Sequence, residues 1–139
     1  MSGSATVNRR SYRRTSAATA CAADQQGGYY RVTGGSGYHA ALWSGTASSM
    51  KDLHPAGALE SQILGMAPGQ QVGWYGAPGT HAALWRGSTS SMIDMNPPSA
   101  GVSSLLATCG SAQVGWANIG GASAGVWFGT ASSFQPLHQ

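Results

Sequence analysis

Histidine and aspartate, the side chains best suited to metal or acid–base chemistry, recur at a fixed interval in this chain. The pairs are His39 with His81 and Asp52 with Asp94, each 42 residues apart. The histidines could ligate a metal ion, and the aspartates could act as paired carboxylates. One interval further on stand Ser123 and Pro136, and because Pro136 has no carboxylate a threefold acidic site is impossible. We therefore predict structural roles, with each His bonded to a nearby backbone group and each Asp capping the turn that follows it.

Other polar residues also favour structure over catalysis. His54 and His138 occupy one repeat position, with Asn96 between them, and we expect solvated turn positions there. Glu60 is the only glutamate, which leaves few options for a glycosidase carboxylate pair. Catalysis usually needs an asymmetric group of residues, whereas these are repeated. We predict no catalytic residue, no metal ligand and no cofactor, and an enzyme with one site in a degenerate copy stays as an alternative.

The aromatic residues fall into two groups. Trp43, Trp85 and Trp127 are 42 residues apart in the most apolar segments, and we predict that they lie in the core. Tyr30 and Tyr75 end a segment beside glycine-rich loops and have Ala117 as their third counterpart. Exposed aromatic rings beside loops can stack on a sugar or a peptide. Tyr30 and Tyr75 are therefore the candidate ligand-binding residues.

The residues named above belong to three copies of one unit of about 42 residues, over 16–60, 61–102 and 103–139. Three extra residues in the first copy fall in the glycine-rich stretch 32–37. Each copy predicts four short strands, which in the second are 61–66, 70–75, 81–85 and 91–95. Ala83 and Trp85 alternate with Ala82 and Leu84, so both faces of that strand are apolar. The class is all-β, and the strand is expected between two layers.

Several folds use four-stranded units of this size. A β-propeller usually has about four to eight such blades, so three blades need a second chain or further sequence to close a ring. A β-trefoil closes with three repeats and is the main alternative, with a three-sided β-prism as another.

The motifs favour blades. His-Ala-Ala-Leu-Trp stands at 39–43 and 81–85, followed by Asp-Leu or Asp-Met, and Gln-Gln-Val-Gly-Trp-Tyr stands at 70–75. These runs resemble the HAF-type extracellular repeats of bacterial proteins across 16–137, with weaker agreement in the third copy. The resemblance implies propeller-type blades, an extracellular or cell-surface location, and no established activity.

Charge is sparse and uneven. Only 8% of the 139 residues are charged, and the formal net charge is +3. Four arginines lie within the first fourteen residues, whereas the chain from Ser16 onward has three basic and four acidic residues. We predict a basic, disordered arm over 1–15 on a domain over 16–139, no specific nucleic-acid partner and no membrane span. No signal peptide is visible, because no apolar core accompanies the small residues near the start.

Together these features predict a non-catalytic repeat module that serves as a binding or structural surface. It is expected to self-associate, most simply as a dimer of three-blade halves that completes a propeller, because open blade edges invite pairing. A glycan or a protein is the expected ligand. The alternative is a monomeric, carbohydrate-binding lectin of the β-trefoil type.

Overall fold

A computed structural model describes residues 15–35, 37–76 and 78–138 and shows three antiparallel sheets, one for each repeat. We call them blades 1, 2 and 3. Their strands are β1 (Ser16–Ala22), β2 (Gln25–Arg31), β3 (Tyr38–Trp43) and β4 (Lys51–Asp52); β5 (Glu60–Ala67), β6 (Gln70–Gly76), β7 (Thr80–Trp85) and β8 (Ile93–Asp94); and β9 (Ser103–Thr108), β10 (Gln113–Asn118), β11 (Ala122–Trp127) and β12 (Gln135–Pro136). The prediction of an all-β chain with three four-stranded repeats is confirmed.

Each fourth strand is shorter than the sequence suggested. In blade 2 the expected strand over 91–95 is β8, of two residues, because the 3-10 helix η2 (Thr89–Ser91) precedes it. Equivalent 3-10 helices, η1 (Ala47–Ser49) and η3 (Ala131–Ser133), precede β4 and β12. In blade 2 the Ser91 hydroxyl oxygen accepts a hydrogen bond from the Arg86 N–H at 2.7 Å and donates one to the Ser88 carbonyl. Serine at this position thus closes the loop, a role that hydrophobic alternation does not reveal.

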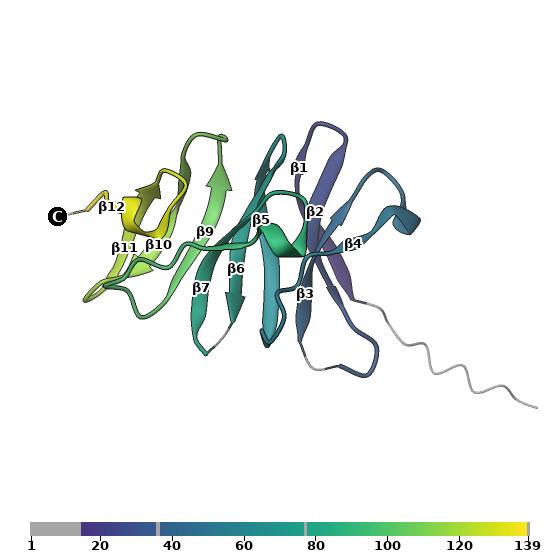
Figure 1. Cartoon of the computed structure of the whole chain (residues 1–139), viewed down its shortest axis with the longest axis horizontal. Helices are drawn as coiled ribbons and strands as arrows, with labels where there is room; N and C mark the ends of the chain where they lie inside the picture. The colour runs from purple at the N-terminus through teal and green to yellow at the C-terminus, as the bar shows by residue number, and fades with distance from the viewer. Residues whose placement is uncertain (1–14, 36, 77, 139) are drawn as a thin grey trace, which may run out of the picture.

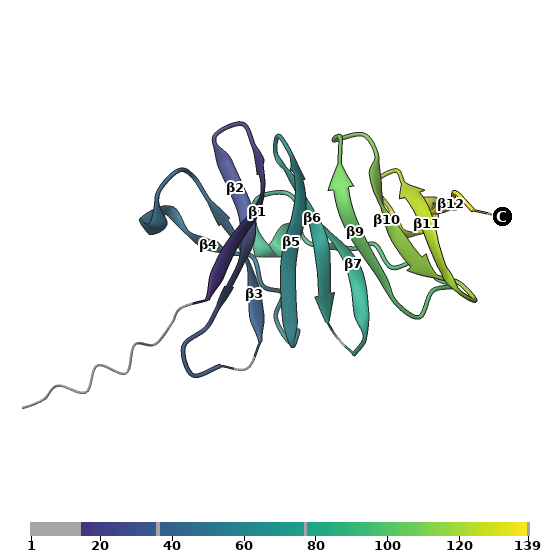
Figure 2. The same cartoon turned by 180° about the vertical axis from the view of Figure 1, so that it is seen from behind.

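The blades stand side by side and pack face to face (Figures 1 and 2). Strand β5 packs against β1, β2 and β3 of blade 1, and β9 packs against β5, β6 and β7 of blade 2. Within each blade the strands pair in chain order, and among the described residues no strand pairs with another blade. A trefoil would join its repeats in one closed barrel, whereas the described strands form three separate four-stranded sheets.

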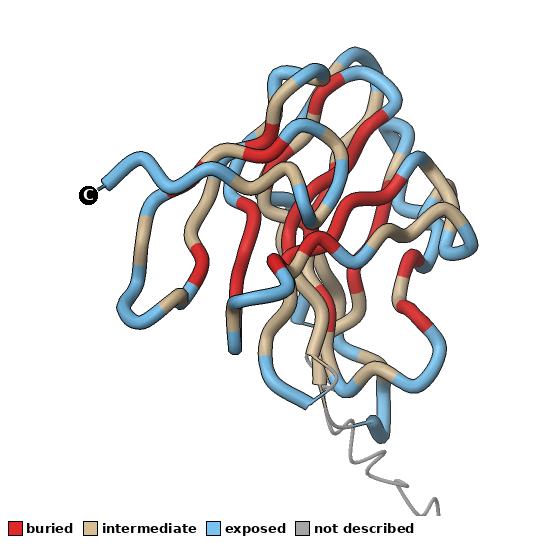
Figure 3. The backbone as a smooth tube through the Cα atoms, turned by 60° about the vertical axis from the view of Figure 1, so that its left-hand side comes forward, coloured by how far each residue is buried: buried red, intermediate tan, exposed pale blue. Residues whose placement is uncertain are grey.

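Strand β7 shows how this stack is built. Ala83 and Trp85 belong to the core between blades 1 and 2, whereas Ala82 and Leu84 belong to the core between blades 2 and 3. The predicted burial of this strand between two layers is confirmed. Burial is concentrated along the strands, while the turns and the C-terminal segment are exposed (Figure 3).

A β-bulge lies between the first two strands of every blade. In blade 2 the register shifts between Ile63 and Gly65, opposite Gly73. A Cβ atom on Gly73 would lie 1.9 Å from the Gln62 carbonyl oxygen, and Gly28 and Gly115 meet the same obstacle in the other blades. Only glycine permits this close backbone approach. The repeated glycine of the Gln-Val-Gly-Trp segment is therefore a requirement of the blade.

Most of the predicted basic arm over 1–15 lies outside the described residues. At its end, the Thr15 carbonyl accepts a hydrogen bond from the Arg31 N–H at 2.8 Å. Within the described part of the chain, no helix has the length and apolar character needed to cross a membrane.

Candidate functional site

The two contacts between blades use the same tryptophan bond. The Trp85 indole N–H of blade 2 donates to the Leu53 carbonyl of blade 1 at 2.9 Å. The Trp127 indole N–H of blade 3 donates to the Met95 carbonyl of blade 2, also at 2.9 Å. Both tryptophans are fully buried, as predicted. Each tryptophan therefore fastens its own blade to the blade before it.

A buried serine makes the second repeated contact. The Ser61 hydroxyl oxygen accepts a hydrogen bond from the Ala40 N–H at 2.9 Å and lies 2.7 Å from His54 Nδ1. Because His54 Nε2 donates to the Ala58 carbonyl, Nδ1 is the acceptor of the Ser61 hydroxyl. The prediction that His54 is solvated is wrong, since it joins blade 1 to blade 2.

The same bonds recur one blade later with an amide in place of the imidazole. The Ser103 hydroxyl oxygen accepts from the Ala82 N–H at 3.0 Å and donates to Asn96 Oδ1 at 2.6 Å. Asn96 Nδ2 donates to the Ala100 carbonyl at 2.9 Å. Sequence reasoning missed these serines. The available signal was a serine at the start of every copy, at positions 16, 61 and 103.

Blade 1 presents the equivalent surface with nothing packed on it among the described residues. We call it the leading face, made of Ser16, Ala18, Tyr30, Trp43 and Met50. Trp43 is half-buried instead of core, contrary to the prediction, and Met50 is 39% exposed. Ser16 and Ala18 are exposed, whereas their counterparts in the other blades (Ser61 and Ser103, Ile63 and Leu105) are buried. The difference arises because no described sheet covers blade 1 on this side.

Blade 3 is uncovered on its opposite side. We call this surface the trailing face, made of Val114, Ala124, Val126 and Leu137. Leu137 is 65% exposed and Val114 is 42% exposed, whereas the counterparts of Leu137 (Leu53 and Met95) and of Val114 in blade 2 (Val72) are fully buried. Ala124 is exposed, although Ala40 and Ala82 at its repeat position are fully buried. Within the described residues, these two uncovered faces therefore belong to the sheets at opposite ends of the stack (Figure 1).

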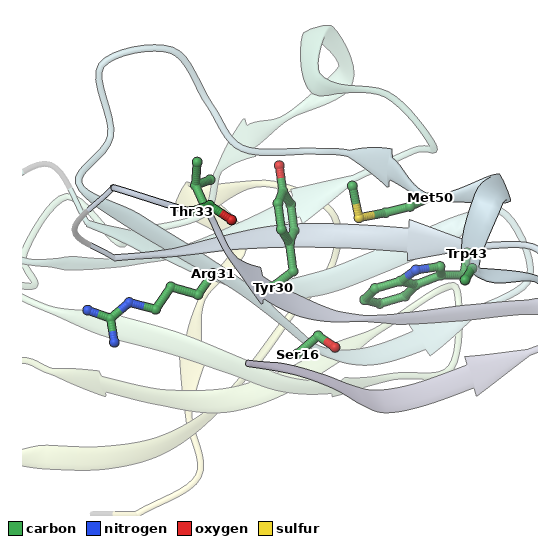
Figure 4. A pocket seen from close by; sticks show the side chains of 8 residues that line it. Ser16, Tyr30, Arg31, Thr33, Trp43 and Met50 are labelled. Carbon is green, nitrogen blue, oxygen red and sulfur yellow. The ribbon is translucent and has the colours of Figure 1, made fainter. Parts of the chain in front are cut away.

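The leading face is hollowed. A surface pocket of about 440 Å³ is lined by Tyr30, Trp43 and Met50 together with Ser16, Arg31, Val32, Thr33 and Ala47. Figure 4 shows the two aromatic rings and the thioether of Met50 along this hollow. In the two internal contacts, the preceding blade covers the equivalent surface.

The predicted tyrosine, histidine and aspartate residues come together within blades 1 and 2. The Tyr30 hydroxyl donates to Asp52 Oδ2 at 2.9 Å, and His39 Nδ1 lies 3.1 Å from the same oxygen. Asp52 Oδ1 accepts the His54 N–H at 2.8 Å, which is the expected turn cap. His39 thus bonds to a carboxylate and not to the predicted backbone group. The group holds the short strand β4 against β2 and β3.

Blade 2 repeats this group with closely similar geometry. The Tyr75 hydroxyl donates to Asp94 Oδ2 at 3.0 Å, and His81 Nδ1 lies 3.1 Å from that oxygen. The Tyr75 ring also packs against the core between blades 1 and 2. Tyr30 is the more accessible of the two candidate ligand-binding residues, because it lines the hollow of the leading face.

These contacts shift several pKa values. Burial, and then the hydrogen bond to Asp52, raises the pKa of Tyr30 to about 12, and Tyr75 beside Asp94 behaves alike. Burial opposes ionisation of Asp52, but bonds from the His54 N–H, His39 and Tyr30 outweigh it and lower the pKa of the carboxyl. Burial, reinforced by the nearby His39, lowers the pKa of His54. The rings of His39 and His54 are stacked with centroids 3.7 Å apart.

This arrangement gives each polar group a structural partner. Both oxygens of the Asp52 carboxylate are bonded within blade 1, and those of Asp94 within blade 2. No group of three or more His, Cys, Asp or Glu residues in the described ranges is placed to hold a metal ion. The bonds to Asp52 and Asp94 join the short fourth strand of each of these two blades to the second and third strands.

One serine motif escaped the sequence reasoning. The run from Gly121 to Gly125 matches Gly-x-Ser-x-Gly, the pattern of a hydrolase nucleophile elbow, with Ser123 at its centre. An elbow needs a sharp turn from a strand into a helix. Ser123 lies instead within β11, paired with Ala117 of β10. The motif therefore lacks the local geometry of a nucleophile.

Comparison of the chain with protein-family models, with curated proteins and with solved structures finds no match. The resemblance to HAF-type repeats stays a prediction from the motifs.

Proposed function

We propose that this chain is a non-catalytic repeat module that self-associates through its two terminal blades, most simply as a dimer that completes a propeller. The assembled ring serves as a binding or structural surface. The observation that carries this proposal is the exposure of Leu137, whose repeat counterparts Leu53 and Met95 are fully buried between blades. In the other two repeats, the residue at this position is thus covered by the next blade.

Apolar burial supplies the driving force. Covering a Val or Leu side chain that is otherwise exposed is worth about 1.5–3 kcal/mol. Val114 and Leu137 on the trailing face, with Met50 on the leading face, are all more than a third exposed. Sheet edges and faces of this kind are commonly covered in natural proteins.

The test is the solution mass under reducing conditions, since Cys21 and Cys109 are exposed free thiols. Light scattering at tens of micromolar is expected to give twice the chain mass of 14.1 kDa. The Leu137→Asp variant should shift the mass toward the monomer. Leu59→Asp places the same charge on a leucine that is 72% exposed in the connection between blades 1 and 2, and should leave the mass unchanged. A wild-type monomer throughout this range refutes the proposal.

A second candidate is sugar binding in the hollow of the leading face. It is favoured by the Tyr30 and Trp43 rings that line this pocket, because aromatic faces stack on sugars. The two functions compete for one surface. Glycan binding by a monomeric protein, lost in Trp43→Ala, would support the second candidate; binding to no glycan on an array would exclude it.

A further inference from the structure

The contacts between blades 1 and 2 and between blades 2 and 3 provide a template for an intermolecular contact. Each pairs the trailing side of one blade with the leading side of the next. In each, an indole N–H donates to a main-chain carbonyl, an alanine N–H donates to a serine hydroxyl oxygen, and an apolar core lies between the two sheets. The leading face of blade 1 and the trailing face of blade 3 are the two halves of this template.

A donor and an acceptor for the indole bond are present at the two ends of the stack. The Leu137 N–H donates to the Ala124 carbonyl at 2.8 Å, just as Leu53 bonds Ala40 and Met95 bonds Ala82 at 2.8 Å. Leu137 thus makes the same main-chain bond as Leu53 and Met95, the two residues whose carbonyls accept a tryptophan. Among the described residues, Trp43 has no such acceptor, because no sheet covers its side of blade 1. A second copy would bring that acceptor.

The residues of the serine contact are also present at the two ends of the stack. Ser16 has the repeat position of Ser61 and Ser103, and it lies exposed in β1. His138 has the position of His54 and Asn96, the residues that meet those serines. Copy three has lost the Tyr, His and Asp of the within-blade group, yet it keeps Leu137 and His138. The positions it keeps are those that act between blades.

The sizes of the facing side chains agree with this pairing. In the first internal contact, a Cβ on Gly27 would come within 2.7 Å of Ile63, so a large leading residue faces a residue without a side chain. In the second, Val72 shares a core with Leu105. At the ends the counterparts are Val114 and Ala18. In a contact of the same kind between two copies, the smallest of the three leading residues would face a valine, which leaves room for the valine.

From these four observations we infer that association is head-to-tail: the trailing face of one chain packs on the leading face of a second copy, as blade 3 would on a following blade. Trp43 of each chain donates to the Leu137 carbonyl of the other, and the hollow beside Trp43 receives the Leu137 segment. This inference rests on the proposed self-association and specifies its partner and its contacts. Two such contacts close a ring of two chains.

Two variants that each block one face test the inference. Leu137→Asp blocks the trailing face and leaves the leading face intact, whereas Ala18→Asp does the reverse. Both residues are exposed in the single chain, so the charge should not disturb its fold. Each variant alone is expected to bind itself about a hundredfold or more weaker than the wild type, because every head-to-tail contact then contains an aspartate in an apolar seat.

Mixing the two variants gives the discriminating result. One intact trailing face and one intact leading face are then present, so a 1:1 heterodimer should form, detected by light scattering with one variant fused to a mass tag. Leu59→Asp alone, which keeps both faces intact and should dimerise like the wild type, serves as the control for charge. Val114→Asp replaces Leu137→Asp if circular dichroism shows that the latter is misfolded.

The outcomes separate this inference from the proposed function. If Leu137→Asp or Ala18→Asp still dimerises as strongly as the wild type, like faces pair and the head-to-tail contact is wrong. If both are monomers and their mixture stays monomeric, the inference is also overturned. Wild-type polymers larger than a dimer would overturn the closed ring. A wild-type monomer refutes the proposed function itself.

Discussion

Replacing Trp85 with Phe tests the central contact between blades. The phenyl ring retains most of the apolar surface but has no N–H, so the Leu53 carbonyl loses its donor. Trp85 and Leu53 are both fully buried, and water cannot readily replace the lost bond. Trp43→Phe is the matched control, because Trp43 has the same repeat position without this bond in the single chain.

The expected magnitude follows from two contributions. A buried carbonyl left without its donor costs about 1–3 kcal/mol. The smaller phenyl ring leaves a void in a packed site, which adds about 1 kcal/mol. The free energy of unfolding should therefore fall by about 2–4 kcal/mol for Trp85→Phe. For Trp43→Phe we expect less than about 1 kcal/mol, as for a partly exposed position.

The assay is urea unfolding followed by far-ultraviolet circular dichroism, which does not depend on tryptophan fluorescence. Both substitutions are made in the Leu137→Asp background, so that intermolecular contacts at Trp43 do not contribute. Equal losses for the two variants would refute the view that the indole acts through the neighbouring blade. A loss below about 0.5 kcal/mol for Trp85→Phe would refute the importance of the bond.

Three further predictions concern the blade itself. Gly73→Ala should abolish folding or cost more than about 3 kcal/mol, because the new Cβ would clash with backbone, while Gly101→Ala, in open space, should be close to neutral in urea unfolding. His54→Asn introduces the residue type of its repeat counterpart, Asn96. Because the pKa of His54 is lowered in the folded chain, the wild type should lose stability as pH falls from 7 through that pKa, and the variant should not. Thermal melts at several pH values measure this, and an unchanged pH profile would contradict it. Because the pKa of Asp52 is lowered in the folded chain, its carboxylate adds to the free energy of unfolding above about pH 4, and this stabilisation is lost as pH falls through the folded-state pKa. Asp52→Asn should therefore make stability less dependent on pH in this acid range. A pH dependence as steep as that of the wild type would disprove this role.

Much of the architecture was predictable from the sequence because it is local and repeated. The 42-residue interval between tryptophans, the four short segments in each copy and the alternation over 81–85 are properties of neighbouring residues. They predicted three four-stranded sheets and a strand buried on both faces. The turn cap by Asp52 was predictable for the same reason, since its acceptor and donor lie two residues apart.

The partners of the polar residues were not predictable from spacing alone. His39 meets Asp52 because β3 and β4 pair, and His54 meets Ser61 because blade 2 packs on blade 1. The two-residue fourth strands also depend on loops closed by Ser91 and its counterparts. Such contacts join residues whose separation in the chain carries no periodic signal.

Trp43 and Trp85 show most clearly what each level decides. By sequence they are equivalent, and both end the segment His-Ala-Ala-Leu-Trp. In the structure Trp85 is fully buried and bonded to Leu53, whereas Trp43 lines an open hollow. The conformation of a blade can be read from the sequence, because it depends on residues within one repeat. Burial of a face depends instead on the neighbouring blade, and among the described residues no blade covers the two ends of the stack.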